Sequence, residues 1–116
     1  MELNTNNQII FITGATSGIG KIAACTLANL GATVVATARS ERKGFELINF
    51  FESKYHKRKG KIEILNCNLS SFESIVNAVE NFRNRYAKLD MLINNAGIFN
   101  NRFKTSENGI EETFHI

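Results

Sequence analysis

The sequence has little of what metal-binding or membrane-spanning proteins need. Its two cysteines and two histidines are scattered, with no C-x-x-C pair and no accompanying cluster of carboxylates, so no metal site is expected. Cys25 and Cys67 are interpreted as reduced, packed thiols. No apolar run approaches the roughly 18 residues of a membrane span, and the polar N-terminus lacks a signal-peptide core. These absences together predict a cytoplasmic protein.

A strong excess of one charge is also absent. The net charge is +3, with 22% charged and 43% hydrophobic residues, which is ordinary for a soluble globular protein. The most basic run, residues 54–61, is one short cluster and too small to predict a nucleic-acid surface. A length of 116 residues allows one core but no separate substrate domain, so residues 1–116 are interpreted as one domain.

Short apolar runs alternate with longer amphipathic segments along the chain. The short runs, typical of buried strands, cover residues 8–13, 33–37, 61–66 and 91–94. Helical spacing is expected over residues 18–30, 41–55 and about 72–86. Strand alternating with helix indicates right-handed crossovers and helices on both faces of a parallel sheet. The predicted fold class is α/β, a Rossmann-type doubly wound sheet of about four strands in the order 3-2-1-4.

Each expected helix has an apolar stripe that is predicted to face the sheet. Gly31 is placed to end the first helix, and Ser70 or Ser71 can cap the third. The stripes consist of Ile19, Ile22, Ala23, Leu27 and Leu30 in the first helix, of Phe45, Ile48 and Phe51 in the second, and of Phe72, Ile75, Val76, Val79, Phe82 and Tyr86 in the third.

A glycine-rich turn joins the first strand to the first helix, and this context makes the pattern informative. Gly14 allows a tight turn out of the strand, and Gly18 removes a side chain where a pyrophosphate approaches the backbone. Gly20 allows the helix to pack closely on the sheet. The free amides at the helix start, with two hydroxyl groups, then face the phosphates. The alternative is a turn that serves chain reversal only. The candidate cofactor-binding residues here are Gly14, Thr16, Ser17, Gly18, Ile19 and Gly20.

The residue after the second strand distinguishes the two nicotinamide dinucleotides. An acid about 20 residues past the glycines suits a ribose 2′-hydroxyl, whereas an arginine suits a 2′-phosphate. Arg39 stands at this place, and residues 36–40 contain no Asp or Glu. A guanidinium binds phosphate in bidentate fashion. We therefore predict NADP(H) as the preferred cofactor, with NAD(H) possible; the alternative for Arg39 is a solvated cation at a helix start.

Two motifs, in order and in the expected elements, make the chain resemble the classical short-chain dehydrogenases/reductases. They are T-G-x-x-x-G-x-G at residues 13–20 and N-N-A-G at residues 94–97. The resemblance covers essentially the whole chain. Residues 37–40, 68–75, 89–98 and 108–111 look similar to the retinol dehydrogenase-like branch. That similarity implies oxidation or reduction of a lipophilic alcohol/carbonyl pair with NADP(H), by analogy only.

The resemblance also implies roles for individual residues. Asn94 would hold the central strands together, and Asn95, Ala96 and Gly97 would line the ribose and nicotinamide side of the cofactor. Where the family usually has an aspartate touching the adenine amino group, this chain has Asn68, followed by Leu69 as a further candidate. An amide can still accept from that amino group or donate to a ring nitrogen. The alternative is an Asx cap for the next helix.

No catalytic residue is assigned within this sequence. In relatives the tyrosine, the lysine four residues later and the serine follow the second motif. Tyr55 and Lys59 match Y-x-x-x-K, but they lie at the far end of the second helix and are interpreted as a solvated loop. The last residues read as an unfinished helix, and the strand at 91–94 would be an exposed edge. We therefore expect a fragment, or a chain that needs its remaining half, and no turnover alone.

Two functions from different classes follow. The leading one is the NADP(H)-binding part of a short-chain oxidoreductase, which transfers hydride between nicotinamide and an alcohol or carbonyl substrate and can form a homo-oligomer. The alternative is a non-catalytic nucleotide-binding or interaction module that retains the fold without the active site. A continuation containing a strand, a serine and Y-x-x-x-K would favour the enzyme.

Overall fold

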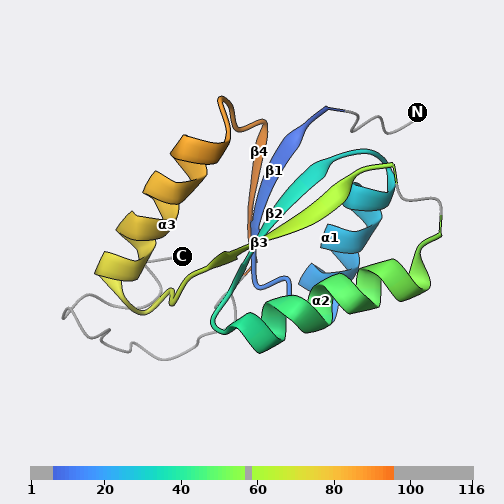
Figure 1. Cartoon of the computed structure of the whole chain (residues 1–116), viewed down its shortest axis with the longest axis horizontal. Coiled ribbons are helices and arrows are strands. Elements are labelled where there is room, and N and C mark those ends of the chain that lie inside the picture. Colours follow the sequence, from blue (N-terminus) through green and yellow to red (C-terminus); the bar gives the residue numbers. More distant parts are fainter. Residues whose placement is uncertain (1–6, 57–58, 96–116) are drawn as a thin grey trace.

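The computed structural model describes residues 7–56 and 59–95, which form one twisted parallel sheet flanked by helices (Figure 1). The strand order is β3-β2-β1-β4, so the predicted fold class and strand order are confirmed. In chain order the elements are β1 (Ile9–Thr13), α1 (Gly18–Asn29), β2 (Thr33–Ala38), α2 (Glu41–Lys54), β3 (Lys61–Asn66), α3 (Phe72–Arg85) and β4 (Met91–Asn94).

Side chains alternate between the two faces of the sheet because the strand period is two residues. Helices α1 and α2 cover one face and α3 covers the other, as Figure 1 shows. The α1/α2 face is lined by Ile10, Ile12, Val34, Ala36 and Ile62, and the α3 face by Phe11, Val35 and Leu65. The β-branched strand residues predicted to be buried therefore form the core between the layers.

Helix α1 packs through small side chains rather than through its large apolar residues. Its buried residues are Gly20, Ala24, Cys25 and Ala28. Ile19 and Ile22, which the periodicity placed on the packed face, are 79% and 52% exposed. The predicted stripe is wrong at these two positions because a helix that lies close to a sheet has room only for small residues along its line of contact.

The other two helices show the same kind of correction. Phe45 of α2 is 66% exposed, whereas Gly44 faces the sheet so closely that an added Cβ would lie 2.7 Å from Ile64 Cγ2. In α3 the buried residues are Ala78 and Phe82. The residues of the predicted stripe that are instead exposed in α3 are Phe72, Val76 and Val79. Hydrophobic periodicity predicts which side of a helix is apolar. It does not predict which residues on that side contact the sheet and which remain exposed.

The helix ends follow the sequence signals. Ser71 caps α3, its Oγ accepting from the Ser74 amide at 3.2 Å, and Ser40 caps α2 in the same way through the Lys43 amide. Helix α1 ends at Asn29 with Leu30 as its C-cap, and Gly31 has a positive φ of 118°, which favours glycine. The predicted end at Gly31 is confirmed, and of the two candidate caps the structure selects Ser71.

Both cysteines are free and buried, as expected for packed thiols. Burial raises the pKa of Cys25 and of Cys67, which keeps both thiols protonated at neutral pH. Within residues 7–56 and 59–95, no helix combines the length and the apolar character needed to cross a bilayer.

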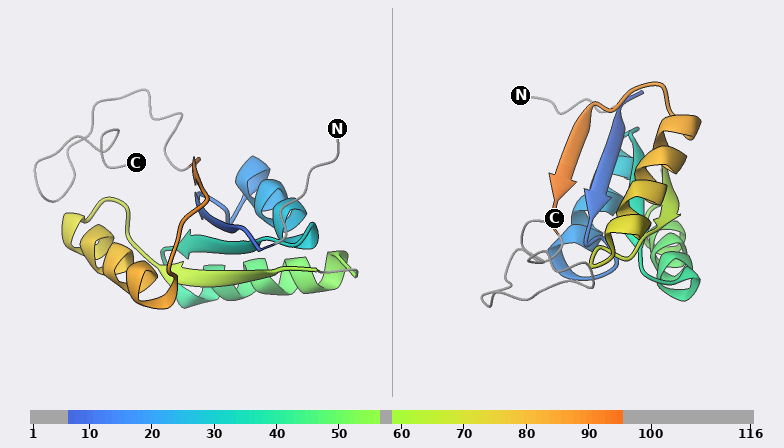
Figure 2. Two further views of the ribbon diagram at one scale, coloured as in Figure 1. Left: turned by 90° about the horizontal axis from the view of Figure 1, so that it is seen from above. Right: turned by 90° about the vertical axis from the view of Figure 1, so that its left-hand side faces the viewer.

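Strands β1 and β4 lie side by side and run in the same direction, as the right-hand view of Figure 2 shows. At their amino ends Asp90 Oδ2 accepts a hydrogen bond from the Ile9 amide at 2.7 Å, and the Ile9 carbonyl accepts from the Asp90 amide at 2.9 Å. Lys88 Nζ lies 3.3 Å from the same carboxylate. The hydrogen bond from Ile9, with help from Lys88, lowers the pKa of Asp90.

The two phenylalanines of α2 provide a matched test of this packing. Phe51 is 3% exposed and its ring centroid lies 5.6 Å from that of Tyr55, whereas Phe45 is 66% exposed. Phe51→Ala is expected to lower the free energy of unfolding by about 3–5 kcal/mol, and Phe45→Ala by less than about 0.5 kcal/mol. Urea unfolding of the full chain measures both. Equal losses would contradict this packing.

Asp90 should make the stability of the chain depend on pH. Because its pKa in the folded state is lowered from 3.8, its contribution is present above that value and is lost as the pH falls through the folded-state pKa. Asp90→Asn is therefore expected to lower the urea midpoint at pH 7, and this difference should shrink as the pH falls below 3.8 and vanish below the folded-state pKa of Asp90. A difference between the two proteins that is constant with pH would refute the assignment.

Candidate functional site

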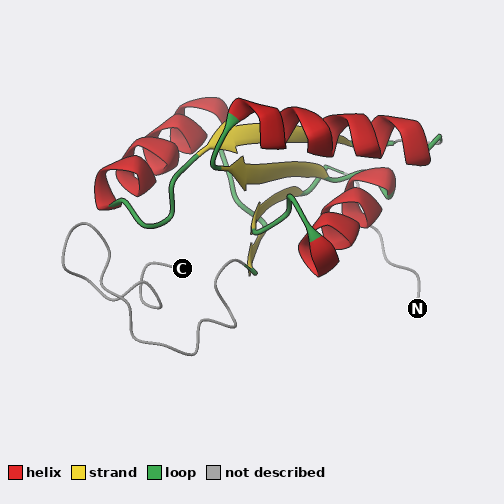
Figure 3. Cartoon of the chain, turned by 90° about the horizontal axis from the view of Figure 1, so that it is seen from below, coloured by secondary structure: helices red, strands yellow, loops and turns green. Residues whose placement is uncertain are grey.

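The carboxyl ends of all four strands lie at one edge of the sheet. The register pairs Thr13 with Asn94 and Ala38 with Asn66, which are the last residues of their strands. In Figure 3, the two strands that are seen along their length point the same way, with their arrowheads at their carboxyl ends. In open parallel sheets ligands bind outside the carboxyl ends of the strands, where the strand order reverses. This edge, at the boundary between β1 and β4, is the candidate site.

The glycine turn after β1 depends on the missing side chains of its glycines. Gly14 and Gly18 have positive φ values of 69° and 59°, which other residues rarely adopt. A Cβ on Gly20 would collide with the Gly14 carbonyl oxygen and would lie 2.5 Å from Asn95 Nδ2. At Gly18, by contrast, an added Cβ would meet nothing within 4 Å. Gly20 therefore permits internal packing, whereas Gly18 borders open space in front of the turn.

The start of α1 has the properties of an anion site. Its N-cap, Ser17, is exposed and its side chain makes no capping hydrogen bond. The first turn contains no acidic residue. The first amides of a helix have no partner within the helix and carry a partial positive charge, which a phosphate can satisfy. Thr16 is half-buried and Ile19 is exposed beside this turn. These residues fit a bound phosphate group without rearrangement of a cap.

A hydrogen-bonded junction joins the glycine turn to the end of β4. The Thr13 hydroxyl donates to Asn94 Oδ1 at 3.0 Å and accepts from the Asn95 amide, also at 3.0 Å. Asn95 Nδ2 in turn donates to the Gly14 carbonyl oxygen at 3.1 Å. The role expected for Asn94 between the central strands agrees with this geometry. Ala96 and Gly97, which the sequence also placed here, lie outside the described residues.

Two features of this junction were not predicted from the sequence. Thr13 was placed at the end of the first strand and at the start of the glycine motif, but no role was predicted for its hydroxyl, which is buried and links both asparagines. Asn95 was assigned to the ligand side, yet its side chain holds the backbone of the turn. The sequence signal that could have revealed the role of Thr13 was a hydroxyl residue at the end of an otherwise apolar strand expected to be buried. A polar group that becomes buried there needs a hydrogen-bond partner.

Arg39 lies immediately after β2 at the same edge and is exposed. Within residues 7–56 and 59–95, no carboxylate forms an ion pair with Arg39, not even that of Glu41 two positions later. Arg42, by contrast, lies 3.8 Å from Glu46 one helical turn later. The guanidinium of Arg39 is therefore available to an anion at the end of β2.

Asn68 follows β3 and forms a turn with its own side chain. Its Oδ1 accepts from the Ser70 amide at 3.1 Å and from the Ser70 hydroxyl at 2.8 Å. This is the Asx-type alternative considered for Asn68, although the N-cap of α3 itself is Ser71. Leu69 is half-buried and packs against the apolar cluster under α3. Both residues lie at the edge that carries the other candidate residues.

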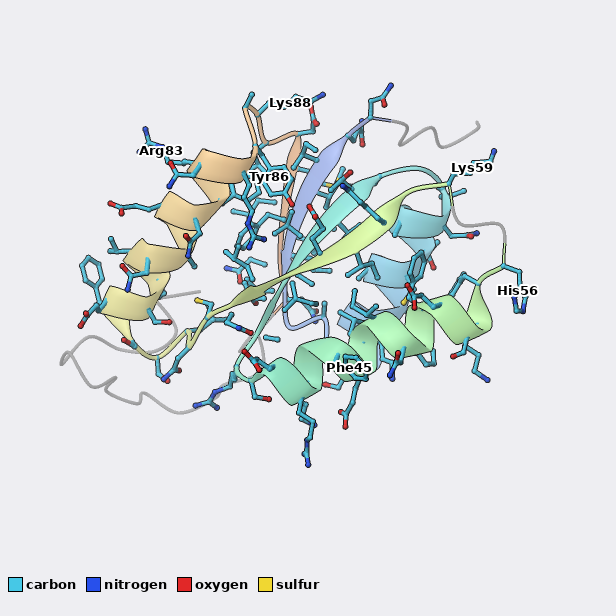
Figure 4. The ribbon with its side chains drawn as sticks, in the orientation of Figure 1. Phe45, His56, Lys59, Arg83, Tyr86 and Lys88 are labelled. Atoms are coloured by element: carbon cyan, nitrogen blue, oxygen red, sulfur yellow. The ribbon has the colours of Figure 1, made fainter. Side chains whose placement is uncertain are left out.

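The Y-x-x-x-K sequence is not part of this site. Tyr55 is the C-cap of α2, at the opposite end of that helix from Ser40, and Figure 4 shows His56 just beyond that end and Lys59 farther away, near the start of β3. The interpretation as a solvated loop is wrong for Tyr55, which is half-buried and packs on Phe51. Across the described part of the chain, no group of three or more His, Cys, Asp or Glu side chains can hold a metal ion.

The sheet order and the glycine turn at the strand-order reversal define a Rossmann-type α/β protein. Residues 8–116 match the family model described as short chain dehydrogenase, and the chain belongs to this family. The family binds a nicotinamide dinucleotide. The match confirms the resemblance seen in the two sequence motifs, although it does not single out the retinol dehydrogenase-like branch.

Curated relatives support the same assignment. The chain is 38% identical over 93 residues to a 3beta-hydroxysteroid dehydrogenase of Mediterraneibacter gnavus, covering 80% of this chain and 32% of the relative. It is 32% identical over 110 residues to human polyprenol dehydrogenase, covering 95% and 33%. The chain thus spans about a third of the length of these relatives. A metagenomic short-chain oxidoreductase in complex with NADP superposes with a TM-score of 0.70 at 32% identity, covering 81% of this chain and 41% of that structure.

Thr13 allows a direct test of the junction. Thr13→Val keeps the shape of the side chain but removes the donor to Asn94 and the acceptor for the Asn95 amide. It is expected to lower the free energy of unfolding by about 1–3 kcal/mol, whereas Thr13→Ser, which keeps the hydroxyl, should lose less. Chemical denaturation measures both variants. If valine were tolerated as well as serine, the hydroxyl would not be the link between β1 and β4.

Proposed function

We propose that the chain forms the NADP(H)-binding part of a short-chain oxidoreductase that acts on a lipophilic alcohol/carbonyl pair. The observation that carries this proposal is the pairing of two anion-accepting features at one edge of the sheet. The uncapped start of α1 follows β1, and Arg39, which has no ion pair with any residue that the structure describes, follows the adjacent strand β2. A dinucleotide with a phosphorylated ribose has a pyrophosphate for the start of α1 and a 2′-phosphate for Arg39.

The pyrophosphate is assigned to the glycine turn. The open space at Gly18 lets a phosphate approach the backbone, and the first amides of α1 donate to its oxygens. The hydroxyls of Thr16 and Ser17 are additional donors, and Ser17 is free to serve because it does not cap its own helix. Gly14 and Gly20 contribute by allowing the turn to close, and Ile19 offers apolar surface beside it.

The 2′-phosphate is assigned to Arg39. Its planar guanidinium matches two phosphate oxygens at once, and residues 36–40 contain no carboxylate that would repel a dianion. A ribose 2′-hydroxyl lacks the charge that this arginine recognises. The preference is therefore for NADP(H) over NAD(H).

The nicotinamide side is assigned to the end of β4, where the Thr13–Asn94–Asn95 junction holds the backbone in place. Asn95, Ala96 and Gly97 are the proposed contacts. Bound NADP(H) supplies the hydride chemistry. The residues of this chain bind and orient the dinucleotide, and none of them is assigned as the acid or base of the reaction.

The substrate class is supported by the relatives and by the sequence stretches similar to retinol dehydrogenases. The named relatives act on a hydroxysteroid and on polyprenol, which are both lipophilic alcohols. A lipophilic alcohol, or the carbonyl formed from it, is accordingly the proposed substrate of the whole protein.

Arg39→Asp tests the cofactor preference. It is expected to weaken NADPH binding roughly 10- to 100-fold, because a charge-assisted hydrogen bond is replaced by repulsion, and to leave NADH binding almost unchanged. Calorimetric titration of the full chain with each dinucleotide measures both affinities.

Arg83→Asp provides the matched control. Arg83 lies in the last turn of α3 (Figure 4), and its replacement changes the net charge by the same amount. This variant should leave the ratio of the two affinities unchanged. If Arg39→Asp weakened NADPH and NADH equally, the assignment of the 2′-phosphate would be wrong.

A further inference from the structure

Strand β3 is an edge strand of the sheet formed by residues 7–56 and 59–95, and the residues that follow β4 start from the opposite edge. The Lys61 amide donates to the Ala32 carbonyl, and the Cys67 amide donates to the Ala38 carbonyl. The direction of the backbone groups alternates from residue to residue along a strand. The N–H and C=O groups of Ile62, which follows Lys61, therefore point away from β2 to the open edge.

The amino half of this edge carries one charge of each sign on the same face. Lys61 Nζ lies 3.8 Å from Glu63 Oε2, and the two side chains are 63% and 34% exposed. On that face Leu65 and Cys67, in the carboxyl half, belong to the apolar cluster under α3. The helix thus leaves the two charged residues uncovered. A second copy of the strand, running antiparallel, can place each lysine opposite a glutamate.

The outer flank of α2 adds exposed apolar surface beside this edge. On its inner flank, the Phe50 ring contacts Lys21 of α1, whose Nζ lies 3.9 Å from the ring centroid. Phe45 (Figure 4) lies about 140° from Phe50 around the helix and therefore faces away from α1, on the side of β3. Phe45 is 66% exposed, and Ile48 on the same flank is half-buried.

We propose that two copies of this chain associate through β3 and the outer flank of α2, about a two-fold axis at Ile62. In this register the two Ile62 residues exchange backbone hydrogen bonds, and each Lys61 faces Glu63 of the second copy. A register centred on Glu63 would instead bring the two glutamates together, which is unfavourable. The two sheets join into one, with the carboxyl edges of the two copies on opposite sides. The contact therefore does not depend on the proposed dinucleotide site.

The spacing of the helices fits this arrangement. Helix α2 contacts both β2 and β3, so its axis lies about one strand spacing, ~4.8 Å, from the two-fold axis. The two α2 helices are then about 10 Å apart, which is an ordinary distance for packed helices.

The two-fold axis also falls near the middle of α2. Gly44 packs against Ile64, and α2 runs opposite to β3. Two strand residues span about the same length as four helical residues, so Ile62 lies beside Ile48. The two helices therefore meet around Ile48, and each Phe45 lies within reach of the second helix.

Charge reversal tests the strand contact. Sedimentation velocity of the full chain over a range of protein concentrations measures the dissociation constant of the dimer. Lys61→Glu and Glu63→Lys should each weaken the dimer about 10-fold, because two attractive cross-strand pairs become repulsive. The double variant Lys61→Glu/Glu63→Lys exchanges the charges and should return the dissociation constant to within about 3-fold of the wild-type value.

Phe45→Ala tests the helix contact. It should weaken the dimer about 10-fold, because an aromatic side chain loses its contact with the second copy. Phe45 is exposed within one copy, so at concentrations where both proteins are monomeric the variant should unfold like the wild type. The comparison separates association from folding.

Lys88→Glu provides the matched control. Lys88 Nζ lies 3.3 Å from Asp90 Oδ2 just before β4, which is the same kind of pair at the opposite edge of the sheet. The substitution changes the net charge as Lys61→Glu does. It should leave the dissociation constant of the dimer unchanged.

Several results would overturn the proposal. A wild-type chain that stays monomeric at its highest soluble concentration would do so, as would a dimer that tolerates both charge reversals. A double variant that remains as weak as the single ones would refute the pairing of Lys61 with Glu63. Weakening by Lys88→Glu, with no effect of Lys61→Glu, would place the contact at the β4 edge instead. None of these measurements involves a dinucleotide, so their failure would leave the proposed function untouched.

Discussion

The site depends on the hydrogen-bonded junction between β1 and β4. Parallel strands that are distant in sequence have no tight turn to set their relative position, and here side-chain hydrogen bonds add to the backbone pairing. Here the Thr13 hydroxyl joins both asparagines that end β4, and Asn95 returns a hydrogen bond to Gly14. At the amino ends, the Ile9–Asp90 pair performs the same task. The register of the two strands is thereby held at both ends.

That junction also sets the position of α1. Asn95 Nδ2 and the Gly14 carbonyl lie so close to Gly20 that only a hydrogen fits there. The first turn of the helix is consequently pressed against the end of β4, while Gly18 faces open space. One set of contacts thus places the anion-accepting amides beside the strand-order reversal. The glycines are needed for different reasons, one for internal packing and one for access.

The same edge shows how local hydrogen bonding decides what a side chain can offer. Ser17 leaves its helix uncapped and Arg39 has no acid as partner in the described ranges, so both can meet an anion. Asn68 differs, because its oxygen is already used by Ser70. Sequence reasoning allowed this amide either polarity, and only its hydrogen-bond partners select one of them.

Local signals were sufficient for much of this protein. Apolar runs, serine caps and the position of Gly31 are properties of short segments, so strands and helices could be read from them, and the strand order followed from the Rossmann-type fold. The glycine spacing and Arg39 likewise stand where the motifs place them. What could not be read is which part of a helix meets the sheet. Ile19, Phe45 and Val79 follow apolar spacing yet are exposed, because burial depends on how closely elements from different parts of the chain approach. The roles of Thr13 and Asn95 arise for the same reason, since their partners are remote in sequence and adjacent only in the folded sheet.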